Sequence, residues 1–312
     1  MSDSINNSVD TSKEKFQILP MASGDSEKIL RPSMTYWQDA WRRFKKNKLA
    51  LVALIMLCLV VFFTIFGPAI SGNQFDELNR KNKNETSSSE FWFGTDNLGR
   101  DLFTRVCVGG RVSLIIGLVC TLVMVTIGML IGGIAGYIGG ITDDLLMRLV
   151  EIIGSIPRLV LVILISLILD KGMLALVLAM TITAWGGTAR LVRGQILQLR
   201  EQEFVLAAKS LGAGPARIIL EHLLPNVLSL IIVRMTFAVP GFIFDEAFLS
   251  YIGLGIQPPN TSWGALASAA QDKIMFYPHQ LFFPALFIVI TMLSFNMIGD
   301  GLSDALDPKL RK

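Results

Sequence analysis

The sequence predicts an all-α, polytopic membrane protein with six transmembrane helices. Of its 312 residues, 52% are hydrophobic and only 17% are charged, and its mean hydropathy is +0.55, beyond the usual apolar share of a soluble domain. A bilayer core of about 30 Å requires roughly 20 helical residues, because each residue adds about 1.5 Å. This length divides the apolar part of the chain into six spans: residues 49–70, 112–136, 145–169, 172–189, 227–249 and 281–299.

Two different segments precede the first span. Residues 1–36 are polar and lack the short apolar core and cleavage site of a secretory signal, so they predict a disordered cytoplasmic tail. In residues 37–48, Trp37, Trp41 and Phe44 recur at helical spacing beside a run of basic residues. This pattern predicts a basic amphipathic helix on the inner membrane surface. A plain positively charged anchor explains the pattern equally well.

Lysine and arginine residues predict the orientation of the spans, because short cytoplasmic loops are rich in them. Five of them stand directly before the first span: Arg42, Arg43, Lys45, Lys46 and Lys48. This side is therefore cytoplasmic, residues 71–111 form an extracytoplasmic loop, and the C-terminal residues 305–312 return to the cytoplasm. The extracytoplasmic loop also contains basic residues, but it is long and holds as many acids. We expect a multi-pass protein of the cell membrane with both termini in the cytoplasm.

The main part of the predicted membrane domain, residues 112–304, contains a packing motif in its second span. Gly128, Gly132 and Gly136 form a repeated G-x-x-x-G. Glycine at this spacing lets another helix approach closely, although small residues are common in membrane helices generally. The motif therefore predicts one tight helix pair without identifying the partner.

Four of the ionisable residues inside predicted spans are candidates for function, because a charge there is costly unless it faces protein or a watery cavity. They are Arg158 in the third span and Arg234, Asp245 and Glu246 in the fifth. All four are candidates for a translocation path, in which the arginines would meet carboxylates or carbonyl groups and the acids would meet an amino group. Each has an ordinary alternative. The arginines snorkel or pair with acids of a neighbouring subunit, and the acids sit at the membrane interface.

Several function classes are disfavoured by what the sequence lacks. It has no G-x-x-x-x-G-K-[ST] loop to cradle nucleotide phosphates, so we do not expect the chain to hydrolyse ATP by itself. Its three cysteines are scattered and its two histidines, His222 and His279, lie far apart, so no metal site and no cofactor is predicted. The net charge of +3 gives no reason to expect nucleic acid as a partner. An intramembrane enzyme is the competing class, because catalytic groups can assemble from distant positions without a motif.

Residues 203–225 form a distinctive segment between the fourth and fifth spans. Their sequence, EFVLAAKSLGAGPARIILEHLLP, lies in the cytoplasm by the predicted topology and is too polar to cross a bilayer. The pattern predicts a short helix, a bend at Gly212 and a second helix that starts at Pro215. Its alanines would let a partner surface approach closely, and an amphipathic connector resting on lipid accounts for the pattern as well.

The same segment resembles the cytoplasmic loop motif of ATP-binding cassette (ABC) importer permeases, usually written EAA…G…LP. The matching residues are Ala207, Ala208, Gly212, Leu224 and Pro225. Leu206 stands where the general motif has glutamate, a departure familiar in the peptide-importer branch. Four further stretches resemble the second permease subunit of dipeptide and oligopeptide importers: WRRFKKNKLALV, FGTDNLGRDLFTRVCVGGRVSL, SYIGLGIQPPNTSWG and FNMIGDGLSDALDPKLR.

The resemblance, which covers nearly everything from residue 37 onward, implies a type I ABC importer permease in the bacterial cytoplasmic membrane. The implied partners are a second homologous permease subunit, two cytoplasmic ATP-binding subunits and an extracytoplasmic peptide-binding protein, around a chain that is not itself an enzyme. Residues 203–225 would be the coupling helix, seated on an ATPase through Leu206, Ala207, Ala208, Gly212, Ala213, Pro215, Leu224 and Pro225. The implied substrate is a peptide, with nickel or glutathione as the alternative within the family.

Overall fold

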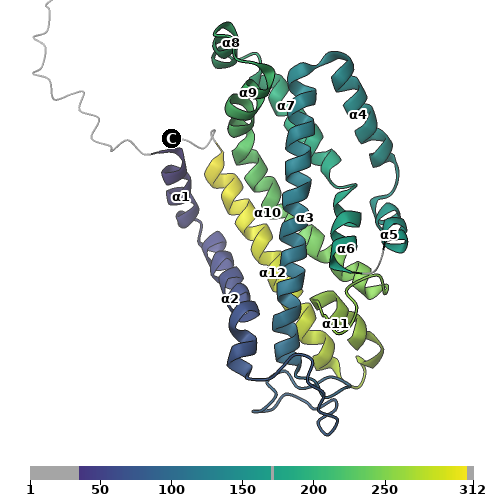
Figure 1. Ribbon diagram of the computed structural model, residues 1–312. Coiled ribbons are helices and arrows are strands. Elements are labelled where there is room, and N and C mark those ends of the chain that lie inside the picture. The colour runs from purple at the N-terminus through teal and green to yellow at the C-terminus, as the bar shows by residue number, and fades with distance from the viewer. Residues whose placement is uncertain (1–34, 170–171, 308–312) are drawn as a thin grey trace, which may run out of the picture. The chain divides into compact units, whose positions relative to one another are not determined.

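The computed structural model describes residues 35–169 and 172–307, which are mostly helical (Figure 1). Apart from Thr35, Tyr36 and residues 305–307, the predicted N-terminal tail and C-terminal segment lie outside the described residues. The β-type pairing among the described residues is an isolated bridge between Thr95 and Asp101. The predicted all-α class is confirmed. The longer helices are α1 (Tyr36–Lys46), α2 (Lys48–Ser71), α3 (Leu102–Ile138), α4 (Gly140–Ser155), α5 (Arg158–Ile168), α6 (Met173–Thr181), α7 (Trp185–Leu199), α8 (Glu203–Ser210), α10 (Leu224–Tyr251), α11 (Trp263–Ala270) and α12 (Pro278–Leu306).

By length and composition, the described residues contain helices enough for six membrane spans if each of two bent helix pairs counts as one span. The continuous spans are α2, α3, α12 and the helical run Pro215–Tyr251 that includes α10. The bent spans are α4 with α5 and α6 with α7. The predicted count is confirmed, but several boundaries differ, as α3 and α7 show. Helix α3 begins at Leu102, so residues 102–111 are helical instead of part of the loop, and α7 continues to Leu199, past the predicted end at residue 189.

Each bent span breaks for a local reason. Helices α4 and α5 meet at 84°, where Pro157 follows Ile156. Proline disfavours the helical conformation of the residue before it, and Ile156 is extended, with φ −93° and ψ 133°. Helices α6 and α7 meet at 42° without a proline. There the Thr181 hydroxyl donates to the Val177 carbonyl at 2.7 Å, a bond of the kind that bends helices, and the Trp185 indole N–H donates to the Ile182 carbonyl at 2.9 Å.

Helices α3 and α7 form the tight pair that the glycine motif predicts. A Cβ atom at Gly132 would lie 2.4 Å from the backbone oxygen of Ala189, and one at Gly136 would lie 3.0 Å from the backbone oxygen of Arg193. One at Gly128 would meet α7 in the same way, at 2.6 Å from a side-chain atom. Because no larger side chain fits at these positions, the glycines set how closely the two backbones approach.

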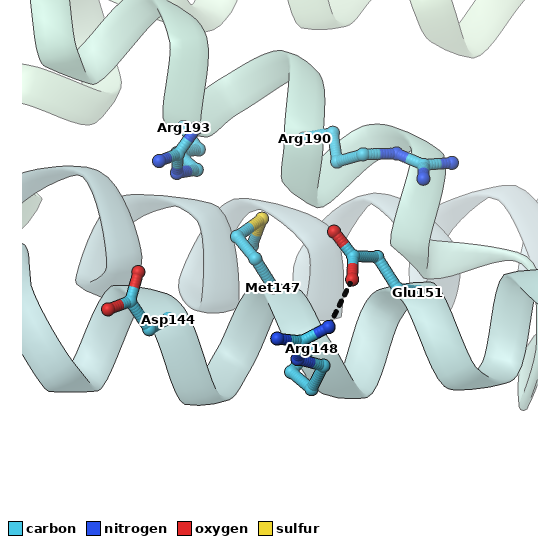
Figure 2. A pocket seen from close by; sticks show the side chains of 6 residues that line it. All are labelled: Asp144, Met147, Arg148, Glu151, Arg190 and Arg193. Atoms are coloured by element: carbon cyan, nitrogen blue, oxygen red, sulfur yellow. Dashed lines mark ion pairs between the residues drawn. The ribbon is translucent and has the colours of Figure 1, made fainter.

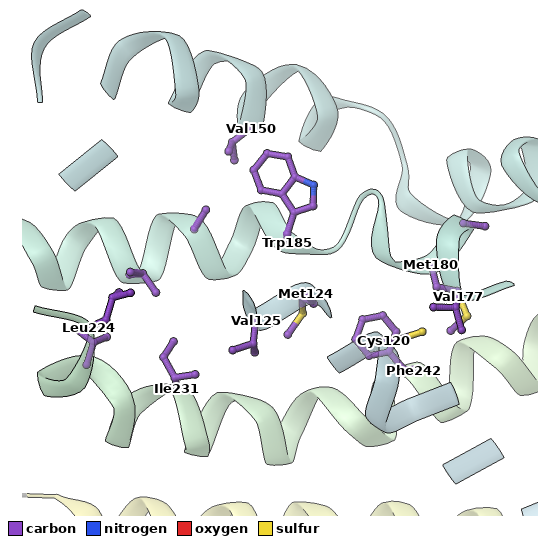
Figure 3. Close-up of a cluster of buried hydrophobic side chains, with 14 of the residues drawn as sticks. Cys120, Met124, Val125, Val150, Val177, Met180, Trp185, Leu224, Ile231 and Phe242 are labelled. Carbon is purple, nitrogen blue, oxygen red and sulfur yellow. The ribbon is translucent and has the colours of Figure 1, made fainter. Parts of the chain in front are cut away.

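A large buried cluster joins α3, α7 and α10 (Figure 3). Cys120 and Met124 come from α3, Trp185 from the first turn of α7, and Ile231 and Phe242 from α10. Trp185 lies directly after the break between α6 and α7, so this cluster fixes the break beside α10.

The two ends of the helical bundle formed by residues 40–306 differ (Figure 1). Helix α8 lies at one end, here called the α8 end, and α11 lies with the loop of residues 72–101 at the other, here called the α11 end. At the α8 end, Phe44 of α1 is buried and packs near Gly301 of α12. Asn47 then caps α2 by accepting from the backbone N–H of Ala50, so the predicted basic segment 37–48 includes the junction between two helices.

Ion pairs and a helix cap order the loop at the α11 end. Asp101 accepts from the first backbone N–H groups of α3, and Asp96 pairs with Arg100 at 2.7 Å and with Arg105 at 3.6 Å. Gln280 of α12 donates to the Thr95 carbonyl of the same loop at 2.9 Å. The loop is therefore a folded part of this end of the bundle.

Candidate functional sites

Residues 203–225 form a helical hook at the α8 end, shaped by one glycine. Gly212 has φ +85°, a left-handed conformation that L side chains adopt at a cost. Its N–H donates to the Lys209 carbonyl at 3.0 Å, and the Ala213 N–H donates to the Ala208 carbonyl at 3.0 Å. Together these bonds form a Schellman motif, which ends α8. Pro215 then opens the next helix in its first turn, so the predicted bend and restart are both confirmed.

Helix α8 is anchored by one side chain and exposes most of the others. Val205 is 2% exposed and packs into the large buried cluster. Phe204, Ala207 and Leu211 lie on another face of the helix, since each residue turns it by about 100°. Phe204 is 42% and Leu211 is 88% exposed, while Ala208 on the same face is half-buried. An exposed apolar face of this kind is typical of a contact surface.

The remaining residues of the importer motif divide between the interior and the surface of the hook. Leu224 is buried and Ala213 packs beside the same cluster, so these two hold the hook on the bundle. Leu206, Pro215 and Pro225 are exposed. Between them, a π-helical stretch, Ile218–Leu223, leads directly into α10. Such π-helical turns occur frequently at functional sites.

A cavity of about 260 Å³ lies where both bent spans break, against the middle of α10. Arg158 opens α5 at one break, and Thr183 and Ala184 form the other. The Thr183 hydroxyl is buried without a hydrogen-bond partner among the described residues. The lining residues are Met124, Arg158, Thr183, Ala184, Arg234, Phe237, Ala238, Gly241 and Phe242.

Two of the four predicted path residues, Arg158 and Arg234, line this cavity, and Asp245 is tied to it through an ion pair with Arg158. Arg158 pairs with Asp245 at 2.6 Å, and its guanidinium carbon lies 5.1 Å from the centre of the Phe242 ring. Arg234 is exposed beside Gly187 of α7, and within residues 35–169 and 172–307 it forms no ion pair. The cavity thus holds one cation that is matched by an acid and one that is not.

Glu246, the fourth candidate, lies elsewhere. Its side chain is 0% exposed and accepts hydrogen bonds from Ser113, Ser250 and Ser262. It does not line the cavity, so we leave it out of the translocation path. Sequence reasoning missed these serines. The available signal was the acid itself, because a buried carboxylate needs hydrogen-bond donors.

A second cleft, of about 620 Å³, lies between α4 and α7 and is lined mainly by charged side chains (Figure 2). Arg190 and Arg193 come from α7, and Arg148 and Glu151 of α4 form an ion pair at 3.6 Å. Beside the cleft, Arg193 donates two hydrogen bonds to Asp143, each of 2.5 Å. This bidentate pair ties α7 to the first turn of α4, and sequence reasoning did not identify it.

Comparison with known proteins gives matches over nearly the whole chain. Residues 128–312 match the family described as binding-protein-dependent transport system inner membrane component, and residues 35–86 match the N-terminal TM domain of oligopeptide transport permease C. The oligopeptide transport system permease protein OppC of Bacillus subtilis is 47% identical over 96% of this chain and 98% of its own length. The dipeptide transport system permease protein DppC of the same organism is 46% identical over 92% and 90%. OppC of Escherichia coli K12 is 42% identical over 92% and 95%.

Proposed function

Because the chain belongs to the inner membrane components of binding-protein-dependent transport systems, which have the type I ABC importer permease fold, we propose that it is a permease subunit for oligopeptides or dipeptides. The observation that carries this proposal is the near full-length similarity to an oligopeptide permease at 47% and a dipeptide permease at 46% identity. Both relatives are transport proteins by name, so the chain is a transport subunit and not an enzyme.

The chain forms half of the translocation pathway, and a second homologous permease subunit forms the other half. Two ATP-binding subunits supply the energy, since this sequence has no phosphate-binding loop of its own. An extracytoplasmic protein delivers the peptide. The α8 end faces the cytoplasm in this arrangement. The basic residues around the junction of α1 and α2, near α12 at the α8 end, support that orientation.

The hook of residues 203–225 couples ATP hydrolysis to transport by docking on one ATP-binding subunit. Its apolar face, with Phe204 and Leu211, has no cover within the described chain and suits a groove on that subunit. Val205 and Leu224 fix the hook to the bundle. Since the helical run Pro215–Tyr251 is continuous, a push on the hook tilts α10 as a lever, and α10 lines the cavity.

The cavity at the two breaks binds groups that every peptide carries. Arg234 is free to pair with the terminal carboxylate, and Asp245 becomes available to the terminal amino group once Arg158 moves away from it. The unpaired Thr183 hydroxyl suits a peptide carbonyl or N–H group. Because these groups are common to all peptides, recognition through them would not depend on the side chains of the peptide, as a general peptide carrier requires.

The proposal is tested with the chain, its partner permease, both ATP-binding subunits and the binding protein reconstituted in proteoliposomes. ATPase activity and uptake are measured with peptides of increasing length, and with nickel and glutathione as the alternative substrates. We expect stimulation and uptake with peptides only. Stimulation by nickel or glutathione without stimulation by any peptide would refute the peptide assignment. A mild-detergent preparation that retains neither an ATP-binding subunit nor a second permease would refute the permease role itself.

A further inference from the structure

The α11 end contains a buried polar cluster that the proposed function does not use. The Glu246 carboxyl group of α10 is fully enclosed. Its Oε1 atom accepts from the Ser262 hydroxyl at 2.6 Å and from the Ser250 hydroxyl at 2.7 Å, and its Oε2 atom accepts from the Ser113 hydroxyl at 2.9 Å. Ser113 lies on α3 and Ser262 caps α11, so one carboxyl group joins three helices.

Two of these hydroxyls are held from the other side as well. The Ser262 hydroxyl oxygen accepts from the backbone N–H of Ala265 at 3.1 Å, the first bond of the α11 cap. The Ser113 hydroxyl oxygen accepts from the backbone N–H of Trp263 at 3.2 Å, and the Trp263 indole N–H donates to the Val106 carbonyl at 2.9 Å. Each of these hydroxyl groups has a single hydrogen. Its oxygen accepts a hydrogen bond from a backbone N–H of α11, and its hydrogen is donated to the Glu246 carboxylate.

Close packing surrounds the cluster. A Cβ atom at Gly264 of α11 would lie 2.4 Å from the Cα atom of Ala247 on α10, and one at Gly109 of α3 would lie 3.0 Å from the Ser262 backbone. Trp263 is 0% exposed. Helix α11 therefore lies directly on α3 and α10, and its first turn cannot shift without breaking the hydrogen bonds to Glu246 and Ser113.

We propose that Glu246 is a positioning residue that latches α11 to the outer ends of α3 and α10. Glu246 and the second part of the hook, residues 215–225, belong to one continuous helical run, near its opposite ends. A tilt of α10 therefore moves α11 with it. This inference rests on the proposed function, in which the α11 end faces the peptide-binding protein. The latch would transmit the movement of the ATP-binding subunits to the surface on which the peptide-binding protein docks. It would also transmit the docking of that protein to the ATP-binding subunits.

The decisive variant is Ser113→Ala, because it lies on α3 yet is expected to loosen α11. Its matched control is Ser268→Ala, which removes a half-buried hydroxyl from α11 itself; the 3.3 Å hydrogen bond of that hydroxyl to the Tyr251 carbonyl is exposed to solvent, so water can replace it. Hydrogen exchange of the α11 backbone amides is measured in the complete transporter in nanodiscs, with exchange in α7 as the internal reference. We expect exchange in α11 to rise at least about fivefold in Ser113→Ala, the change for leaving one buried polar group unpaired. Ser268→Ala should leave it unchanged.

ATPase activity gives the second readout. We expect Ser113→Ala to keep the basal activity while its stimulation by the peptide-loaded binding protein falls, and Glu246→Gln to fall less than Glu246→Ala because glutamine keeps one acceptor oxygen. Unchanged exchange in α11 of Ser113→Ala, or full stimulation despite faster exchange, would overturn the latch. Failure of the proposed function looks different, because the unaltered complex would then show no peptide-dependent ATPase activity at all.

Discussion

Replacement of Gly212 tests whether the shape of the hook sets the affinity for an ATP-binding subunit. Nothing lies within 4 Å of a Cβ atom at this position, so only the backbone conformation opposes a side chain. At φ +85°, an alanine costs about 1–2 kcal/mol in the left-handed region. If the docked hook must keep this bend, Gly212→Ala should weaken binding by about 5- to 30-fold, because 1.4 kcal/mol corresponds to about tenfold.

Two further replacements at Gly212 grade the effect. Asparagine adopts the left-handed region more readily than alanine, so Gly212→Asn should bind better than Gly212→Ala. Proline fixes φ near −65° and removes the N–H that donates to Lys209, so Gly212→Pro should cost about 3 kcal/mol or more and uncouple peptide uptake. The assay is titration of the purified ATP-binding subunits against the permease pair in nanodiscs, together with peptide uptake per ATP hydrolysed.

The matched control for this series is Gly194→Ala in α7. A Cβ atom at that glycine would also have no neighbour within 4 Å, but its φ lies outside the left-handed region. This variant should therefore bind the ATP-binding subunits with unchanged affinity. Equal affinity of Gly212→Ala and the unaltered protein, or wild-type peptide uptake by Gly212→Pro, would refute the reasoning.

Three more predictions concern the contact face, the cavity and the helix pair. Ala208→Glu places a carboxylate on the half-buried edge of the contact face of α8, and should abolish peptide uptake while leaving the protein in the membrane; wild-type uptake would contradict the docking role. Asp245→Asn should lower peptide-stimulated ATPase activity, and the reversed pair Arg158→Asp with Asp245→Arg should recover part of it; no recovery would mean that the ion pair itself does not matter. Gly132→Leu should destabilise the detergent-solubilised permease pair by about 1–3 kcal/mol or more, because α7 leaves no room for the side chain, and this loss is measured as a lower unfolding temperature. Gly154→Leu, which has open space around it, should leave the unfolding temperature unchanged.

The sequence predicted best those features that a single residue type imposes on the backbone. Gly128, Gly132 and Gly136 predicted a close helix pair, since only glycine allows such an approach, and α7 supplies the partner. Gly212 and Pro215 likewise predicted the bend and the restart of the hook, because each has a conformational preference that few other residues share. In both cases the required conformation is local, so no knowledge of distant partners was needed.

The breaks in the spans could be read only in part. Pro157 is a local signal for the break between α4 and α5, whereas the break before Trp185 has no proline and depends on side-chain hydrogen bonds that a pattern of apolar residues does not reveal. Conversely, Arg234 interrupts the apolar pattern of the fifth span but not its helix. Its long side chain extends beside Gly187, where α7 leaves space, so the charge is accommodated without a change in the backbone.

Asp245 and Glu246 show where sequence reasoning stops and what the structure adds to the mechanism. The two acids are adjacent, yet a turn of about 100° directs them to different neighbours: Asp245 to Arg158 of α5, and Glu246 to serines of α3, α10 and α11. The first is a single ion pair that is partly open, with the Arg158 side chain 42% and the Asp245 side chain 17% exposed. The second is enclosed, and breaking it would leave several buried polar groups unpaired at about 1–3 kcal/mol each. When α10 tilts, the contact with α5 should therefore open first, while α3, α10 and α11 move as one body, which places the moving boundary of the pathway at the Arg158 side of the cavity.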